Sequence, residues 1–253
     1  MQNSMPSSLL MMISFLTLVS ALGWVFITIS VNSTYAQVEI PTDKNITSPI
    51  FNRTTSEDAE PRPDILYSTL KSDTIVGEVR NNFSYPIESV LITASVYDKN
   101  GVIAATGDTY TSDYQIKPGM KSGFDINLEK QLPGNSKYTL TTRLEKSKAD
   151  KPEALQLSVG KNSKDSKSFR VIGEVLNQGE DTANSVRVSG IFYDKDHKVL
   201  DVDYTYTNPG VISPNKKAPF ELSFYTNNVD KIKTIAINAQ SDEYSLVTNS
   251  TPK

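Results

Sequence analysis

The sequence predicts an all-β chain: two tandem antiparallel β-sandwiches preceded by one N-terminal hydrophobic helix. Three observations lead to this prediction. Residues 9–31 form a stretch of 23 residues without a charge near the start of the chain. Short segments of alternating apolar and polar residues follow after residue 64, and no segment there has a sustained helical period. Most of these segments occur twice, at one constant spacing.

The N-terminal hydrophobic segment is long enough to cross a bilayer as a helix. Residues 1–36 are therefore either a signal peptide, cleaved after Ala36, or a signal anchor that keeps residues 9–31 in the membrane. The length favours the anchor, whereas the small residue Ala36 favours cleavage. A buried helix of a soluble domain is a third alternative. Both export alternatives place the rest of the chain outside the cytoplasm, either secreted or anchored to the membrane.

The segment after the hydrophobic stretch is polar and contains four prolines, so residues 37–63 are predicted to be a disordered tether. The last residues, 248–253, are predicted to be a tail. Sequons of the form N-x-S/T, which an exported chain can carry glycosylated, start at Asn32, Asn45, Asn52, Asn82 and Asn249. Asn32 is lost on cleavage or lies too near the membrane, which leaves the other four as possible glycosylation sites.

The internal repeat is the most informative feature of the sequence. Three pairs of strings are 96 positions apart: Ile75-Val76-Gly77-Glu78-Val79-Arg80-Asn81 with Val171-Ile172-Gly173-Glu174-Val175-Leu176-Asn177, Tyr97-Asp98-Lys99 with Tyr193-Asp194-Lys195, and Thr109-Tyr110-Thr111 with Thr205-Tyr206-Thr207. This spacing predicts a duplicated domain, with one repeat at residues 64–147 and the other at 152–247. It also predicts that residue n superposes on residue n+96 from 75 to about 143.

Six strands are expected in each repeat. They are residues 65–70, 75–81, 90–97, 102–111, 122–128 and 138–144 in the first repeat, and 154–159, 171–177, 186–193, 198–207, 218–224 and 233–239 in the second. Alternation of period 2 places eight side chains in the two cores: Val90, Ile92, Ala94, Val96, Val186, Val188, Gly190 and Phe192. Asn100-Gly101 is a strong hairpin signal. Six or seven strands in under about 100 residues are typical of an immunoglobulin-like sandwich.

The repeats resemble a known family, the FxLYD domain. The resemblance rests on a Gly-Glu-Val-x-Asn strand, a strand that ends in Tyr-Asp and a proline-containing loop before a Phe. The strings that match Phe-x-Leu-Tyr-Asp are Ala94-Ser95-Val96-Tyr97-Asp98 and Gly190-Ile191-Phe192-Tyr193-Asp194. Tyr-Asp is kept in both, while the Phe and Leu positions differ. The resemblance covers about residues 65–145 and 155–241 and implies an extracytoplasmic immunoglobulin-like module without catalytic residues. The Thr34-Tyr35-Ala36-Gln37 string is similar to export signals of ammonia-oxidising archaea.

Composition excludes several classes of function. The net charge is −3, which argues against a nucleic-acid partner because such proteins carry a basic excess. There is no cysteine and only one histidine, His197, so thiolate catalysis, zinc-thiolate sites and multi-histidine metal sites within the chain are excluded. No nucleophile motif or phosphate-binding loop occurs. We therefore expect no enzyme activity and no cofactor.

Two groups of residues are candidates for binding. Asp98 and Asn100 in the first repeat, and Asp194 and Asp196 in the second, place oxygen ligands two residues apart, as a calcium loop does at its start. A hairpin turn accounts for the same residues. The tyrosines Tyr97, Tyr110, Tyr193 and Tyr206 recur at matched positions, where they form either a binding surface or cross-strand packing.

The sequence thus favours a non-enzymatic cell-surface protein that presents two sandwich modules for protein interaction or envelope structure. Its expected partners are unidentified proteins at the cell surface, and the membrane itself through residues 9–31 if that segment is not cleaved. A calcium-dependent adhesion or ligand-binding protein is the alternative, and a hydrolase is a further one.

Overall fold

The computed structural model describes residues 25–28, 62–226 and 229–247. Within these residues the chain is all-β, as predicted, with one turn of 3-10 helix and no α-helix. The strands of the first repeat are β2 (Asp64–Leu70), β3 (Thr74–Arg80), β4 (Ile87–Tyr97), β5 (Ile103–Tyr110), β6 (Gln115–Ile116), β7 (Lys121–Asn127) and β8 (Lys137–Lys146). Those of the second are β9 (Glu153–Lys164), β10 (Ser168–Asn177), β11 (Arg187–Tyr193), β12 (Val199–Tyr206), β13 (Lys217–Tyr225), β14 (Thr234–Gln240) and β15 (Ser245–Leu246).

The first repeat consists of two antiparallel sheets that pack face to face. One sheet has the order β2-β3-β7, and in the other β4 pairs with β5, β6 and β8. The apolar core between the sheets includes Ile75, Ile92, Phe124 and Leu140. The predicted alternation is present in β4, where Val90, Ile92, Ala94 and Val96 are at most 1% exposed. β-branched residues suit this half-buried pleated surface, which explains the strand.

The second repeat has the same two groups of strands, β9-β10-β13 and β12-β11-β14, around a core that includes Leu155, Phe192, Phe220 and Ile237. The short strand β15 joins the two groups into one hydrogen-bonded path, because it is antiparallel to β14 and parallel to β9. Val186, Val188, Gly190 and Phe192 are buried as predicted.

The pairing registers of the two repeats agree with the spacing of 96. Gly77 lies opposite Phe124 in the first repeat, and Gly173 lies opposite Phe220 in the second. Three positions with a left-handed backbone also recur at this spacing: Ser89 and Ser185, Gly101 and His197, Gly119 and Asn215. A non-glycine residue in this conformation is uncommon. Its recurrence indicates that the two backbones follow the same path through these turns.

The last strand departs from the predicted spacing. Val96 pairs with Tyr138, whereas its counterpart Phe192 pairs with Ile235, so the spacing there is 97. The prediction of 96 up to residue 143 is therefore wrong for this strand, as is the match of residues 138–144 with 233–239. The connection before β14, which includes the 3-10 turn η1 (Val229–Lys231), has one more residue than its counterpart. Surface connections accept such insertions at small entropic cost.

Of the stretch predicted to be an N-terminal helix, the structure describes only residues 25–28. β1 (Val25–Thr28) is antiparallel to β14, with Val25 opposite Ile237. This pairing places β1 beside β14 in the sheet. The rest of the hydrophobic stretch, residues 37–61 of the predicted tether and the tail at 248–253 lie outside the described residues. No helix in the described part of the chain has the length and apolar character needed to span a membrane.

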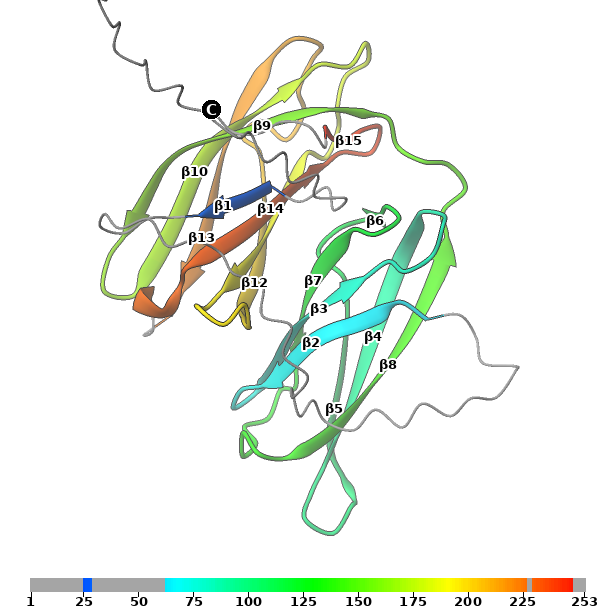
Figure 1. Ribbon diagram of the computed structural model, residues 1–253, viewed down its shortest axis with the longest axis vertical. Helices are drawn as coiled ribbons and strands as arrows, with labels where there is room; N and C mark the ends of the chain where they lie inside the picture. The colour runs from blue at the N-terminus through cyan, green and yellow to red at the C-terminus, as the bar shows by residue number, and fades with distance from the viewer. Residues whose placement is uncertain (1–24, 29–61, 227–228, 248–253) are drawn as a thin grey trace, which may run out of the picture.

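The two sandwiches lie side by side and touch through one sheet each (Figure 1). The β2-β3-β7 sheet of the first repeat faces the β12-β11-β14 sheet of the second. β4 and β8 lie on the far side of the first repeat, and β10 and β13 lie on the far side of the second (Figure 1). This arrangement buries a set of residues that neither sandwich core uses.

Candidate interaction interface between the two repeats

An apolar cluster holds the two repeats together. Val76 of the first repeat packs with residues of the second, namely Ile191, Tyr193, Val199, Val202 and Ala236. Gly123 allows this close approach, because a Cβ at that position would lie 2.5 Å from Val202 Cγ1. The outward face of β11 is consequently as buried as its inward face, with Ile191 at 1% and Tyr193 at 2% exposure. The alternation of the strand predicts that these two residues are on the outer surface of their sandwich, and it cannot show that the other repeat covers them.

Asp113 is buried beside this cluster, in the connection between β5 and β6. Its Oδ2 accepts a hydrogen bond from Ser122 Oγ (2.6 Å), and its Oδ1 accepts from Ser189 Oγ (2.7 Å) and Asn238 Nδ2 (2.9 Å). Ser189 and Asn238 belong to the second repeat. Burial raises the pKa of Asp113, and the three hydrogen bonds partly offset that rise. A buried carboxylate without donors is costly, so Asp113 requires the second repeat to be in place.

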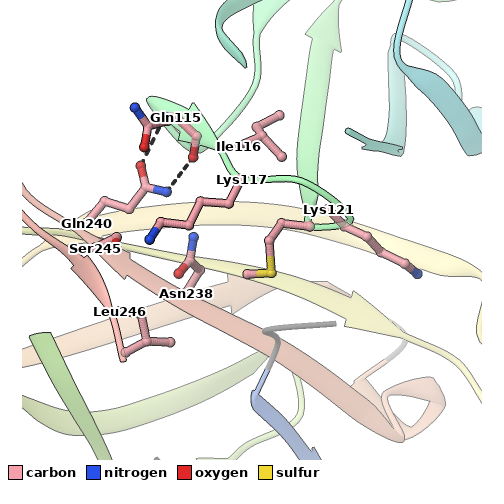
Figure 2. Close-up of a pocket in the computed structure, with 9 residues that line it drawn as sticks. Gln115, Ile116, Lys117, Lys121, Asn238, Gln240, Ser245 and Leu246 are labelled. Carbon is pink, nitrogen blue, oxygen red and sulfur yellow. Dashed lines mark hydrogen bonds between the residues drawn. The ribbon is translucent and has the colours of Figure 1, made fainter. Parts of the chain in front are cut away.

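Two glutamines make a reciprocal pair across the same boundary (Figure 2). Gln115 N donates to Gln240 Oε1 (3.1 Å), and Gln240 Nε2 donates to the Gln115 carbonyl (2.6 Å). The Gln115 side chain also donates to the Ala149 carbonyl (2.7 Å) and accepts from Lys151 N (3.1 Å). The segment between the repeats is therefore held against the interface.

A third contact combines a tyrosine with an ion pair. Tyr193 Oη donates to Glu78 Oε2 (2.5 Å), and Lys121 Nζ lies 3.1 Å from Glu78 Oε1. Burial, followed by the negative charge of Glu78, raises the pKa of Tyr193 far above its ordinary value. The hydroxyl therefore keeps its proton and serves as a permanent donor to the carboxylate.

Arg187 forms the outer rim of the interface together with tyrosines from both repeats. Its guanidinium carbon lies 4.0 Å from the centre of the Tyr114 ring and 4.2 Å from that of Tyr204, within cation–π range. Its Nη1 donates to the Ser112 carbonyl (2.9 Å) and its Nη2 to Tyr206 Oη (2.9 Å). Burial raises the pKa of Tyr114 to about 12, and hydrogen bonds from Tyr114 and Arg187 lower the pKa of Tyr206.

Three carboxylates approach one another at another edge of the interface. Asp125 on β7 faces Asp201 and Asp203 on β12, and Lys71 Nζ lies 3.7 Å from Asp201 Oδ1. Burial, followed by the charge of Asp201, raises the pKa of Asp125 to about 6. Burial also raises the pKa of Asp201 and of Asp203. The contact between the repeats thus brings like charges together at neutral pH.

The calcium candidates lie in the two matching hairpin turns. Asp98 Oδ1 accepts hydrogen bonds from Asn100 N (2.8 Å) and Val102 N (2.9 Å). Asp194 Oδ1 accepts from Asp196 N (2.8 Å) and Lys198 N (2.9 Å) in the same way. These bonds are the ones that the turn interpretation predicts. No group of three or more His, Asp or Glu that could hold a metal ion occurs within residues 62–226 and 229–247.

The remaining sequence candidates are dispersed. Asn82 is exposed in the β3–β4 connection, with its Nδ2 2.9 Å from Asp64 Oδ1, and Asn45, Asn52 and Asn249 lie outside the described residues. Of the four matched tyrosines, Tyr193 is buried in the interface, Tyr206 lies at its rim, Tyr97 is half-buried and Tyr110 is exposed. His197 occupies the left-handed turn position that Gly101 has in the first repeat.

Sequence reasoning missed most of the interface, including Asp113, Gln115, Arg187, Asn238 and Gln240. A signal for three of them is present in the repeat itself. Within otherwise similar strings, the counterparts of Asp113, Gln115 and Arg187 at the spacing of 96 are Pro209, Val211 and Leu91. A change from polar to apolar between two copies marks positions whose surroundings differ, which is the case for a face covered in only one copy.

Comparison with known proteins assigns no family to the chain. No protein-family model matches it, and no curated protein matches it. Among solved structures, red sea bream transglutaminase is 13% identical, with 75% of this chain and 31% of that chain covered and a TM-score of 0.26. An exo-chitosanase of Amycolatopsis orientalis, in complex with PNP-beta-D-glucosamine, is 11% identical, with 68% and 24% covered and a TM-score of 0.23. This chain spans less than a third of the length of either protein.

Proposed function

We propose that this chain is a non-enzymatic extracytoplasmic protein that presents two FxLYD-like, immunoglobulin-like sandwich modules for protein interaction or envelope structure. The N-terminal segment directs export and leaves the protein secreted or anchored to the membrane. The polar tether spaces the modules from that membrane. The partners are proteins at the cell surface.

The observation that carries this proposal is the buried polar interface between the repeats. Asp113, Gln115 and Tyr193 each have their hydrogen-bond partner in the other repeat. A buried polar network whose members are satisfied favours one arrangement over others, because any shift leaves polar groups unpaired. Two sandwiches held in one orientation present their outer sheets as a fixed, broad surface, which suits recognition of another protein.

The dimensions of two hollows are consistent with this function. The crevice in Figure 2, lined by Gln115, Lys117, Asn238 and Gln240 among others, has a volume of about 10 Å³. A second hollow, beside Lys71, has a volume of about 160 Å³. Small-molecule sites usually have about 300–1,000 Å³. The first hollow has room for about one water molecule.

Crosslinking in intact cells, followed by mass spectrometry of the full-length protein, tests the proposal. We expect crosslinks from the outer sheets to other surface proteins or to further copies of the chain, and a mature N-terminus at Gln37 or an intact N-terminal segment. Crosslinks to cytoplasmic proteins alone would contradict the proposal. Turnover by the purified full-length protein in a broad panel of hydrolase substrates would contradict its non-enzymatic part.

A further inference from the structure

The contact between the repeats joins two different faces of the same fold. We call the outward side of β2-β3-β7, and of its counterpart β9-β10-β13, the first face. The outward side of β5-β4-β8, and of its counterpart β12-β11-β14, is the second face. Within the chain, the first face of repeat 1 packs on the second face of repeat 2. The first face of repeat 2 and the second face of repeat 1 remain uncovered by the described residues, on opposite sides of the molecule (Figure 1).

We propose that a second copy of this chain covers these faces. The first face of repeat 2 in one molecule docks on the second face of repeat 1 in the next, and repeats the contact already present within each chain. This inference rests on the proposed interaction function and names the partner. Four comparisons between the internal contact and the uncovered faces support it.

The residues of the tyrosine–carboxylate–lysine contact have identical counterparts on the two uncovered faces. The counterparts of Glu78, Lys121 and Tyr193 are Glu174, Lys217 and Tyr97. Lys217 Nζ lies 3.3 Å from Glu174 Oε2, so the ion pair is already formed, and about half of each side chain is exposed. Among the described residues, Tyr97 Oη shares a hydrogen bond with the exposed Thr139 Oγ1 (3.2 Å), either atom donating. In the docked pair, Tyr97 of one molecule donates to Glu174 of the next.

Two residues of the apolar cluster between the repeats also have apolar counterparts on the uncovered faces. Val76, which is fully buried between the repeats, has Ile172 as its counterpart, and Ile172 is 39% exposed. Val199, on the opposing face, has Ile103 as its counterpart, and Ile103 is 56% exposed. Docking would bring these two exposed isoleucines into the positions where the internal contact buries two valines. Burial of this apolar surface favours association.

Between the internal contact and the uncovered faces, a larger side chain on one face is matched by smaller side chains on the other. Within the chain, a Cβ at Gly123 would collide with Val202 and lie 3.1 Å from Ile191 Cγ1. On the uncovered faces the glycine is replaced by the larger Pro219. The two residues opposite it are replaced by smaller ones, because Ile191 corresponds to Ser95 and Val202 to Thr106. The volume added on one face is therefore removed from the other.

A pair of opposite charges in the internal contact is replaced by two uncharged residues on the uncovered faces. Within the chain, Asp113, which Ser122 of β7 holds beside the first face, is buried near Arg187 of the second, and Arg187 lowers the pKa of Asp113 against the effect of burial. The counterpart of Asp113 is Pro209, and that of Arg187 is Leu91. Both charges are absent from the uncovered pair of faces. Docking therefore buries no unpaired carboxylate or guanidinium at this position.

The proposed contact is heterologous, since it joins two different faces. Such contacts build rings when the rotation closes and open filaments when it does not. Isologous dimers, in which one face meets itself, are not expected. A cross-link between two different faces therefore distinguishes this contact from an isologous dimer.

Engineered cysteines test the proposal, because the chain contains no cysteine of its own. Two differently tagged full-length chains are co-expressed, one with Ser95→Cys and the other with Pro219→Cys. The internal contact brings a Cβ at position 123 within 3.1 Å of a side-chain atom of residue 191, which is inside disulfide reach. We expect a disulfide-linked dimer of the two tags on mild oxidation of intact cells.

Chains with one cysteine type provide the controls. Either variant expressed alone should give no linked dimer, and neither should Pro219→Cys with Asn135→Cys, which lies in the exposed β7–β8 connection. Dimers in the single-variant cells, or none in the mixed cells, would overturn the proposal. If the mixed cells give no dimer while crosslinking still finds other surface proteins as partners, the proposed function stands and only the docking of copies fails.

A charge reversal tests the same contact independently. Lys217→Glu leaves the internal interface untouched, since Lys217 is exposed on the uncovered face. It places like charges beside each other where Tyr97 docks. In the mixed cysteine assay we expect at least about a tenfold loss of linked dimer. An unchanged yield would contradict the assignment of Glu174 and Lys217 to the contact.

Discussion

At the scale of single residues, Tyr97 and Tyr193 show how one position acquires two environments. Each is the last residue of the matching strand in its repeat, β4 or β11, and the sequence left open whether it forms a binding surface or packs across strands. Tyr193 is 2% exposed and donates to Glu78, whereas Tyr97 is half-buried beside the exposed Thr139. The difference arises from the covering repeat, because the two strands have the same register.

Tyr193 and Lys121 both donate hydrogen bonds to the Glu78 carboxylate, and the substitution Tyr193→Phe removes the first of these donors. We expect the free energy of unfolding to fall by about 1.5–3 kcal/mol, since the lost bond goes to a buried carboxylate. The matched control Tyr97→Phe should change it by less than about 0.5 kcal/mol. Denaturant unfolding of both variants at low protein concentration measures these values. Equal effects of the two substitutions would contradict the assigned role of Tyr193.

The substitution Asp125→Asn tests the like charges between the repeats. The pKa of Asp125 is raised to about 6 in the folded protein, from an ordinary value of 3.8. The folded state therefore binds this proton more tightly, so stability falls as the pH rises from about 4 to 6 and levels off above that range.

Removal of the charge should raise the Tm at pH 7 and leave it nearly unchanged at pH 4. Asp201, Asp203 and Lys71 face Asp125 and are kept in both proteins, so the comparison of wild type and variant isolates Asp125. Thermal melts across this range provide the measurement. A variant with the same pH dependence as the wild type would show that Asp125 does not titrate there.

At the scale of elements, most strands and turns were predictable from the sequence. Period-2 alternation identified the core sides of β4 and β11, and Asn100-Gly101 identified a turn in which Gly101 has a φ of 81°. The last strand was matched wrongly, because an extra residue in a loop leaves no trace in the alternation of the strand itself. β15 was missed, since two residues are too few to show a period.

The contact between the sheets depends on the missing side chain of Gly123. Gly123→Ala places a Cβ 2.5 Å from Val202 Cγ1, and we expect a loss of about 1–3 kcal/mol in the free energy of unfolding. Gly134→Ala is the matched control, because the nearest atom to its Cβ is 3.7 Å away, and it should be neutral or slightly stabilising. Denaturant unfolding compares the two. A Gly123→Ala variant as stable as the control would indicate that the sheets are not closely packed there.

At the scale of the whole molecule, the sequence predicted two repeats and left their relation open. Periodicity shows which side of a strand faces its own core, but it cannot show that the other side meets a second domain. The sequence does contain signs of that contact: Ile191 is apolar on an outward face, and Asp113 and Gln115 are polar where the other repeat has apolar residues. These signs can be interpreted only once the two faces are known to touch. The candidate interface was therefore largely beyond sequence reasoning.

The buried contacts between the repeats hold them as one unit of fixed orientation. Spin labels at Asn135→Cys and Glu180→Cys, both exposed and in different repeats, allow the distance between the repeats to be measured by pulsed electron paramagnetic resonance. We expect a single narrow distance distribution. Asp113→Ala should broaden it, because Ser189 and Asn238 then lose their acceptor. A broad or two-peaked distribution in the protein that keeps Asp113 would contradict a fixed orientation of the repeats.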